Sequence, residues 1–302
     1  MTGSGGVVLF KALRPAQWLK NGVVPAAYFF ALWDPSQAQQ VRGFAPFLQV
    51  VAAVICFCAL SSGVYLINDL HDIEADRVHP VKRLRPLASG AMTRGSALFL
   101  SAALLVAAFA GSLVLPPAYT AVLFAYLHLQ MLYTFALKRI AYVDVFIIAV
   151  GFVMRAAAGA MALSVRLSPW LLLCTFLLAL FLALCKRRHE KLLFANQAEI
   201  HRAALSGYNL QLLDSQIGIA AAATIVCYSI YTLSTETVAR FGTSGLGLTI
   251  PFVIFGIFRY LDLVYNSQDG GRPERVLLSD RMMIITILCY GLTALAVFLW
   301  PQ

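Results

Sequence analysis

Long apolar runs separated by polar connections dominate the pattern of this chain. Several runs exceed the roughly 18 residues that indicate a membrane span. The hydropathy pattern predicts nine helical spans. Their expected ranges are 18–34, 45–68, 96–114, 118–137, 142–163, 168–185, 214–235, 246–265 and 282–300. The longest polar connections, at 69–95 and 186–213, follow the second and sixth spans.

The composition agrees with a chain that lies mostly in lipid. Hydrophobic residues make up 60% of the sequence and charged residues only 12%, whereas soluble globular proteins carry about 25% charged residues. Met1 to Phe10 lack the features of a removable signal peptide. We therefore expect an all-α membrane protein with one integral membrane domain over residues 1–302.

Basic residues predict the orientation of the spans. Of the 23 lysines and arginines, 19 lie in the N-terminal segment or in the loops after the even-numbered spans. Three lie on the opposite side, and Arg155 lies inside the fifth span. The positive-inside rule then places the N-terminus and the polar loops in the cytoplasm. Topology and anionic lipids explain the net charge of +9, and without a separate basic domain nucleic-acid binding is not expected.

An acidic cluster follows the second span. Asp69, Asp72 and Asp76 have the spacing i, i+3, i+7, which on one helix places three carboxylates within about 60° of one another. Like charges so close together require a cation. Hard oxygen ligands suit Mg²⁺, which typically uses one or two carboxylates plus substrate phosphates. We therefore predict a Mg²⁺-bound diphosphate at this membrane edge.

Cations follow the acidic cluster directly. Lys82, Arg83 and Arg85 lie between Pro80 and Pro86. Cations beside metal-binding carboxylates suit an anion that carries several phosphates. For Arg85, phosphate binding and a purely topological role stay equally open.

Other polar residues mark the ends or the interior of the apolar spans. Arg155 follows Asp144 by eleven residues, so both face the same way on a helix. A cavity-facing role and a buried ion pair are both open for Arg155. Further candidates for substrate binding are Lys20, Asn68, Tyr133, Lys138, Lys186, Arg187, Glu190 and Tyr208.

The motif Asn68-Asp69-x-x-Asp72-x-x-x-Asp76 resembles the first aspartate-rich motif of the UbiA superfamily of intramembrane prenyltransferases. The pattern of spans and long loops is similar along essentially the whole chain. Finer features resemble the decaprenyl-phosphate phosphoribosyltransferase branch. They are Leu13-Arg14-Pro15-x-Gln17-Trp18-x-Lys20-Asn21, Val64-Tyr65-Leu66-Ile67-Asn68-Asp69, Glu74-Ala75-Asp76-Arg77, His79-Pro80-x-Lys82-Arg83-x-Arg85-Pro86, Cys185-Lys186-Arg187 with Glu190, and Arg259-Tyr260 with Asp280-Arg281. The second acidic motif that prenyl-diphosphate users usually carry after span six is replaced by Lys186, Arg187, Glu190 and a lone Asp214.

The resemblance implies nine transmembrane helices around a central cavity with cytoplasmic cap loops. It also implies transfer of 5-phosphoribose from phosphoribosyl diphosphate to a polyprenyl phosphate such as decaprenyl phosphate, with Mg²⁺ and release of pyrophosphate. Such a product feeds arabinan synthesis for the cell wall from the plasma membrane of a bacterium. Two alternatives stay open: an aromatic prenyltransferase that uses a polyprenyl diphosphate, and a transporter. Chain length of the lipid and homo-oligomer formation stay open as well.

Overall fold

The computed structural model describes residues 5–193, 205, 207–266, 276 and 279–299, and within these ranges every regular element is a helix. The all-α prediction is therefore confirmed. The elements are α1 (Gly5–Leu13), η1 (Pro15–Val23), α2 (Ala26–Leu32), α3 (Ala38–Val41), α4 (Phe44–His71), α5 (Ile73–Val78), η2 (Lys82–Leu84), α6 (Arg94–Ser112), α7 (Pro117–Phe135), η3 (Leu137–Arg139), α8 (Val143–Leu163), α9 (Pro169–Leu193), α11 (Leu210–Leu233), α12 (Thr235–Phe241), η5 (Gly245–Thr249), α13 (Ile250–Asn266) and α15 (Arg281–Leu299).

Seven helical segments in the described part of the chain are long and apolar enough to cross a membrane. They are α4, α6, α8, α9, α11, η5 with α13, and α15. The predicted count of nine is not confirmed. The expected fourth span is the 19-residue helix α7, and the expected first span is divided into η1 and α2. Pro25 lies at that division, where its missing amide N–H interrupts the hydrogen-bond series of a helix.

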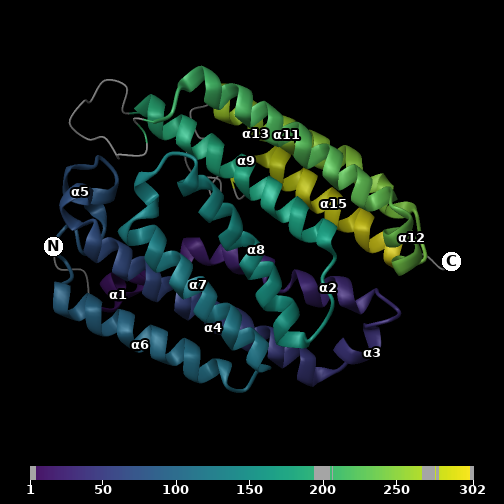
Figure 1. Cartoon of the computed structure of the whole chain (residues 1–302), viewed down its shortest axis with the longest axis horizontal. Coiled ribbons are helices and arrows are strands. Elements are labelled where there is room, and N and C mark those ends of the chain that lie inside the picture. The colour runs from purple at the N-terminus through teal and green to yellow at the C-terminus, as the bar shows by residue number, and fades with distance from the viewer. Residues whose placement is uncertain (1–4, 194–204, 206, 267–275, 277–278, 300–302) are drawn as a thin grey trace.

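Helix α8 lies between two groups of helices, with α4, α6 and α7 on one side and α9, α11, α13 and α15 on the other (Figure 1). Its Val145 packs in a core cluster with residues of α9, α11 and α13, and its Ala158 packs in a cluster with residues of α4 and α7. In lipid such packing depends on close contact, since lipid tails are as apolar as the side chains. A Cβ at Gly159 would lie 1.8 Å from the carbonyl oxygen of Val24. Glycine there allows the segment after η1 to lie directly against α8.

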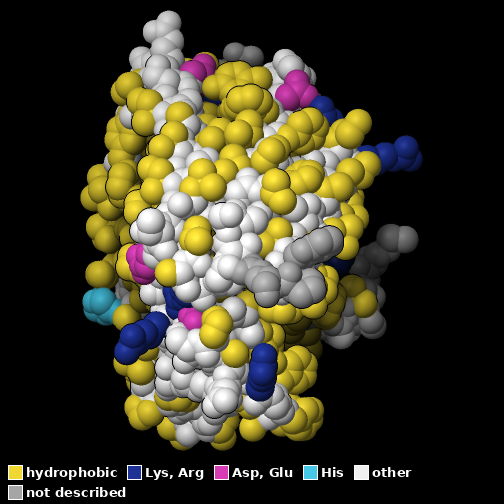
Figure 2. Space-filling model, turned by 90° about the vertical axis from the view of Figure 1, so that its right-hand side faces the viewer, with side chains coloured by type: hydrophobic (Ala, Val, Ile, Leu, Met, Phe, Trp, Pro, Cys, Tyr) yellow, Lys and Arg dark blue, Asp and Glu magenta, His cyan; other side chains and the backbone are white. Residues whose placement is uncertain are grey.

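The outer surface of the bundle suits contact with lipid. Large side chains such as Phe99 and Val106 of α6, Ile219 of α11 and Leu292 of α15 are each more than half exposed. Figure 2 views the end that carries α3 and α12, and shows hydrophobic side chains along both flanks with only scattered charged ones. Together with the seven apolar helices, this surface identifies a multi-pass membrane protein.

Candidate functional site

A cavity of about 680 Å³ lies among η1, α4, α5, η2, α7, η3, α8 and α9. It gathers most of the side chains that the sequence suggested. Those that line it are Lys20, Asn68, Asp72, Asp76, Lys82, Arg85, Tyr133, Lys138, Arg155, Lys186, Arg187 and Glu190. Asp69 and Tyr208 lie just behind the cavity wall. Asp69 accepts a hydrogen bond from the lining residue Arg85, and Tyr208 donates one to Asp144. Arg83 is exposed on η2 and is not brought to the cavity.

The acidic cluster does not lie on one continuous helix, contrary to the spacing argument. Helix α4 ends at His71, and Asp72 forms the junction to α5 with φ −99° and ψ 9°. The bend separates the carboxylates into two groups. Asp69 and Asp76 are almost fully buried, whereas Asp72 turns toward η3.

Arg85 joins the two buried carboxylates. Its Nη1 lies 3.0 Å from Asp69 Oδ1 and also donates to Asp76 Oδ2. Arg14 donates to the same oxygen of Asp69. Burial raises the pKa of the Asp76 carboxyl, and the nearby Arg85 and Lys82 offset only part of that rise. The two carboxylates thus share one cation, the Arg85 guanidinium.

Asp72 belongs to a second contact within the cluster. Lys138 Nζ donates to Asp72 Oδ1 over 2.6 Å, and the side-chain amide of Asn68 donates to Asp72 Oδ2 over 3.2 Å. This contact ties the end of α4 to η3, between α7 and α8. It brings Lys138, which the sequence marked separately, to Asn68 and Asp72 of the aspartate-rich motif.

The acidic cluster fits a divalent cation in one respect and not in another. No three acidic, His or Cys side chains in the described ranges are grouped closely enough to hold a metal by themselves. However, Asp69 and Asp76 both contact the same nitrogen of the Arg85 guanidinium. This guanidinium is a cation between the two carboxylates, where a metal would bind. Mg²⁺ typically takes only one or two carboxylates and completes its shell with phosphate oxygens and water. The residues fit Mg²⁺ in the company of a diphosphate.

Arg14 is a site residue that the sequence reasoning placed in a motif but not in the site. It lines the cavity, contacts Asp69, and lies 5.2 Å from the ring centroid of Tyr65. Its φ of 55° and ψ of 58° are left-handed, which is uncommon for a residue other than glycine. Pro15 follows it and disfavours right-handed helix at this position. The Arg-Pro pair was the available signal.

The opposite wall of the cavity contains a buried ion pair. Arg187 is 1% exposed, and its Nε donates to Asp144 Oδ2 over 2.7 Å while its Nη1 donates to Glu190. The hydroxyl of Tyr208 donates to Asp144 Oδ1 over 2.6 Å and accepts from the backbone N–H of Tyr142 over 2.8 Å. Burial and the adjacent Asp144 carboxylate raise the pKa of Tyr208. Asp144 and Glu190 thus hold the Arg187 side chain directly, and Tyr208 holds Asp144 in turn.

Asp144 and Arg155 do not form the ion pair that their common helix face left open. Eleven residues correspond to about 16 Å along a helix, so a common face does not bring them to the same level. Asp144 pairs with Arg187 instead. Arg155 donates to Asn21, Gly151 and Tyr126, and its side chain lines the cavity.

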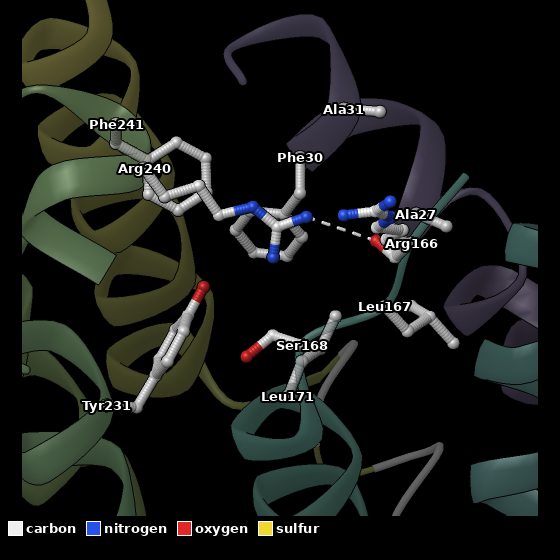
Figure 3. Close-up of a pocket in the computed structure, with 10 residues that line it drawn as sticks. All are labelled: Ala27, Phe30, Ala31, Arg166, Leu167, Ser168, Leu171, Tyr231, Arg240 and Phe241. Atoms are coloured by element: carbon white, nitrogen blue, oxygen red, sulfur yellow. Dashed lines mark hydrogen bonds between the residues drawn. The ribbon is translucent and has the colours of Figure 1, made fainter. Parts of the chain in front are cut away.

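A much smaller hollow of about 10 Å³ lies at the other end of the bundle. Figure 3 shows its walls, where Arg240 points toward the backbone of Arg166 and donates to that carbonyl over 3.1 Å. Arg240 Nε also lies 2.6 Å from Asp34 Oδ2. Burial raises the pKa of Asp34, but hydrogen bonds from Ser36, Arg240 and Gln37 outweigh it and lower the pKa to about 2. A space of one water's size accommodates no substrate, so the large cavity is the candidate active site.

Comparison with known proteins agrees with the fold and the motif. Decaprenyl-phosphate phosphoribosyltransferase from Mycolicibacterium smegmatis is 35% identical over 290 residues, which cover 93% of this chain and 89% of that protein. The enzyme of the same name from Corynebacterium glutamicum is 34% identical over 302 residues, which cover 97% and 88%.

Solved structures share the architecture. A UbiA homologue from Archaeoglobus fulgidus, determined with GPP and Mg²⁺ bound, superimposes with a TM-score of 0.71 at 17% identity, over 96% of this chain and 99% of that one. A digeranylgeranylglyceryl phosphate synthase structure gives a TM-score of 0.67 at 16% identity, over 97% and 99%. The model of the UbiA prenyltransferase family matches residues 23–276. This chain belongs to the UbiA prenyltransferase family.

Proposed function

We propose that the protein is a decaprenyl-phosphate phosphoribosyltransferase, a pentosyltransferase. It transfers 5-phosphoribose from phosphoribosyl diphosphate to a polyprenyl phosphate and releases pyrophosphate. The relatives of that name, similar over almost the whole chain, support the assignment. The observation in this molecule that carries it is the charge of the cavity.

Cations strongly outnumber acids along the cavity wall. The lining residues include nine lysines and arginines but only three acidic residues. Phosphoribosyl diphosphate carries a diphosphate and a separate 5-phosphate, and a polyprenyl phosphate adds one more phosphate. A prenyl diphosphate with a neutral aromatic acceptor carries far less negative charge. The excess of cations therefore favours the phosphoribosyl reaction over the prenyl reaction.

Asp69 and Asp76 would hold Mg²⁺ on the diphosphate, with Asp72 close by. When bound, the metal neutralises the negative charge that develops on the leaving pyrophosphate. Arg14, Lys82 and Arg85 would contact the diphosphate oxygens, and their positive charges would favour its departure.

The other wall of the cavity would receive the acceptor. Lys186 and Arg187 would orient its phosphate, and Lys20 and Lys138 line the same cavity. A phosphate oxygen is already an anionic nucleophile, so no side chain needs to remove a proton. Apolar lining residues such as Val64 and Leu182 would keep water from the electron-poor ribose carbon. Asn68, Tyr133 and Glu190 complete the polar wall, while Tyr208 acts behind it through Asp144.

The orientation that we propose rests on the excess of lysine and arginine in one set of loops. We place the N-terminus and the cavity mouth on the cytoplasmic side of the bacterial plasma membrane, where both substrates and Mg²⁺ are available. The chain functions as a single domain in this arrangement. The lipid tail of the acceptor would extend from the cavity into the bilayer.

The test is a turnover assay on protein in nanodiscs, with radiolabelled phosphoribosyl diphosphate, a polyprenyl phosphate and Mg²⁺. We expect a labelled lipid that disappears with EDTA and in Asp76→Asn. Glu74→Gln is the matched control, because Glu74 lies on the same helix with its side chain 70% exposed, and it should retain activity. No labelled lipid, but prenylation of 4-hydroxybenzoate from a polyprenyl diphosphate, would replace this proposal with the aromatic prenyltransferase.

A further inference from the structure

Arg155 lies within the membrane-spanning helix α8, 4% exposed. Its Nε donates to Asn21 Oδ1 over 2.9 Å, its Nη1 to the carbonyl of Gly151 over 2.8 Å, and its Nη2 to the Tyr126 hydroxyl over 2.6 Å. All three acceptors are neutral. No acidic residue in the described ranges forms an ion pair with Arg155.

The guanidinium is held in a fixed direction. Asn21 is 1% exposed, and its amide nitrogen donates to Ser61 Oγ over 3.1 Å and to Cys58 Sγ over 3.2 Å. The amide oxygen of Asn21 is thereby left facing Arg155. Such support from surrounding residues is typical of a binding group that must keep its geometry.

Aromatic rings surround the same guanidinium. Its central carbon lies 5.5 Å from the ring centroid of Phe57, 4.9 Å from that of Tyr126 and 5.2 Å from that of Phe152. Cation–π contacts stabilise a buried cation in part. They leave its full positive charge without a counter-ion.

Arg187 provides the comparison within the same cavity. It is also buried, but Asp144 and Glu190 neutralise it. Burying a charge without a partner is costly, and ionisable groups inside a membrane mark binding sites or relays. Because Arg155 lines the cavity, an anionic ligand is able to supply the missing charge.

We infer that Arg155 binds a phosphate group of a substrate inside the cavity, at a position separate from the diphosphate. The inference rests on the proposed function, since its two substrates supply that phosphate. One source is the 5-phosphate of the donor, and the other is the phosphate of the lipid. Arg155 lies about 16 Å along α8 from Asp144, so Arg155 and the Asp144–Arg187 pair act at different depths.

The test compares affinities of matched ligands in nanodiscs by calorimetry. The donor pair is phosphoribosyl diphosphate and ribosyl 1-diphosphate, both with Mg²⁺. The lipid pair is a short polyprenyl phosphate and the corresponding polyprenol. Arg155→Gln should weaken the binding of either phosphoribosyl diphosphate or the polyprenyl phosphate roughly 10- to 100-fold. Binding of the matched ligand without that phosphate, ribosyl 1-diphosphate or the polyprenol, should change little. Arg155→Lys keeps the charge and should recover part of the loss.

The pair that responds identifies the source of the phosphate. Arg42→Gln is the matched control, since Arg42 is exposed near the opposite end of the bundle. It should change neither the affinity ratio of the two donor ligands nor that of the two lipid ligands. Unchanged ratios in Arg155→Gln would overturn the inference. If that variant does not fold, the wild-type protein alone tests the inference. Equal affinities of the wild-type protein for the two ligands of each pair would overturn the inference.

The two proposals fail in different ways. If the wild-type protein forms the labelled lipid but Arg155→Gln leaves both affinity ratios unchanged, only the role of Arg155 is refuted. Wild-type protein that binds neither phosphorylated ligand removes the proposed function, and this inference with it.

Discussion

Asp144→Asn is the substitution whose consequence follows most directly from the contacts. The side chain of Asp144 is 0% exposed and that of Arg187 is 2% exposed. Asparagine keeps the shape and one carbonyl oxygen but removes the negative charge. It leaves Arg187 with Glu190 as its remaining acidic partner and weakens the bond from Tyr208.

The expected cost follows from the burial of the pair. Breaking a buried ion pair by removing one partner typically costs about 3–5 kcal/mol. Because Glu190 still neutralises part of the Arg187 charge, we expect a loss near the lower limit, about 3 kcal/mol. Asp144→Asn should also weaken binding of the lipid phosphate, because Arg187 loses one of the contacts that direct it into the cavity.

The assay is equilibrium unfolding in mixed micelles with increasing SDS, followed by tryptophan fluorescence, with the midpoint compared between variants. Glu74→Gln again serves as the control, since it removes one charge from an exposed pair and should give no measurable change. The reasoning is refuted if Asp144→Asn unfolds at the wild-type midpoint. It is also refuted if the effects of Asp144→Asn and Arg187→Met simply add in the double variant, because additive effects would mean that the two side chains do not interact.

Three further predictions concern other parts of the molecule. Arg85→Gln should tighten Mn²⁺ binding measured by electron paramagnetic resonance without pyrophosphate, because the guanidinium no longer competes for the two buried carboxylates; unchanged binding would contradict this. Gly159→Ala should lower the SDS midpoint by an amount equivalent to about 1–3 kcal/mol, since the new methyl would overlap the Val24 carbonyl. The pKa of Asp34 is lowered to about 2, so its stabilisation is present above its ordinary pKa of 3.8 and is lost as the pH falls toward 2. Arg240→Gln should weaken that acid dependence, which thermal unfolding at pH 5 and pH 2.5 would measure.

The sequence predicted the membrane class and most of the cavity wall because both depend on local patterns. Apolar runs reveal helices directly, and Asp69, Asp72 and Asp76 stand out as acids at a membrane edge. What the spacing could not show was the bend at Asp72, where α4 gives way to α5. At that bend Asp72 forms an ion pair with Lys138, and the two residues are far apart in sequence.

The same limit explains the partners of the buried arginines. Helical periodicity predicted that Asp144 and Arg155 share one face of a helix, and both lie in α8. It gave no information on depth relative to α9, and the depth decides that Arg187 reaches Asp144 while Arg155 faces neutral groups. Pairing between helices depends on how they are offset along their axes, which one sequence does not encode in any short pattern.

Two residues with a positive φ lie beside the two charged walls of the cavity. Arg14 has a φ of 55° and Tyr142 a φ of 67°, and each directly precedes a helix, η1 and α8 respectively. Such conformations cost about 1–3 kcal/mol and persist only where surrounding contacts determine them. For Arg14 the contact is with Asp69, and for Tyr142 it is the bond from its N–H to Tyr208, which in turn holds Asp144. In both places a strained turn is linked through one side chain to a buried carboxylate, so the backbone conformation and the charge arrangement stabilise each other.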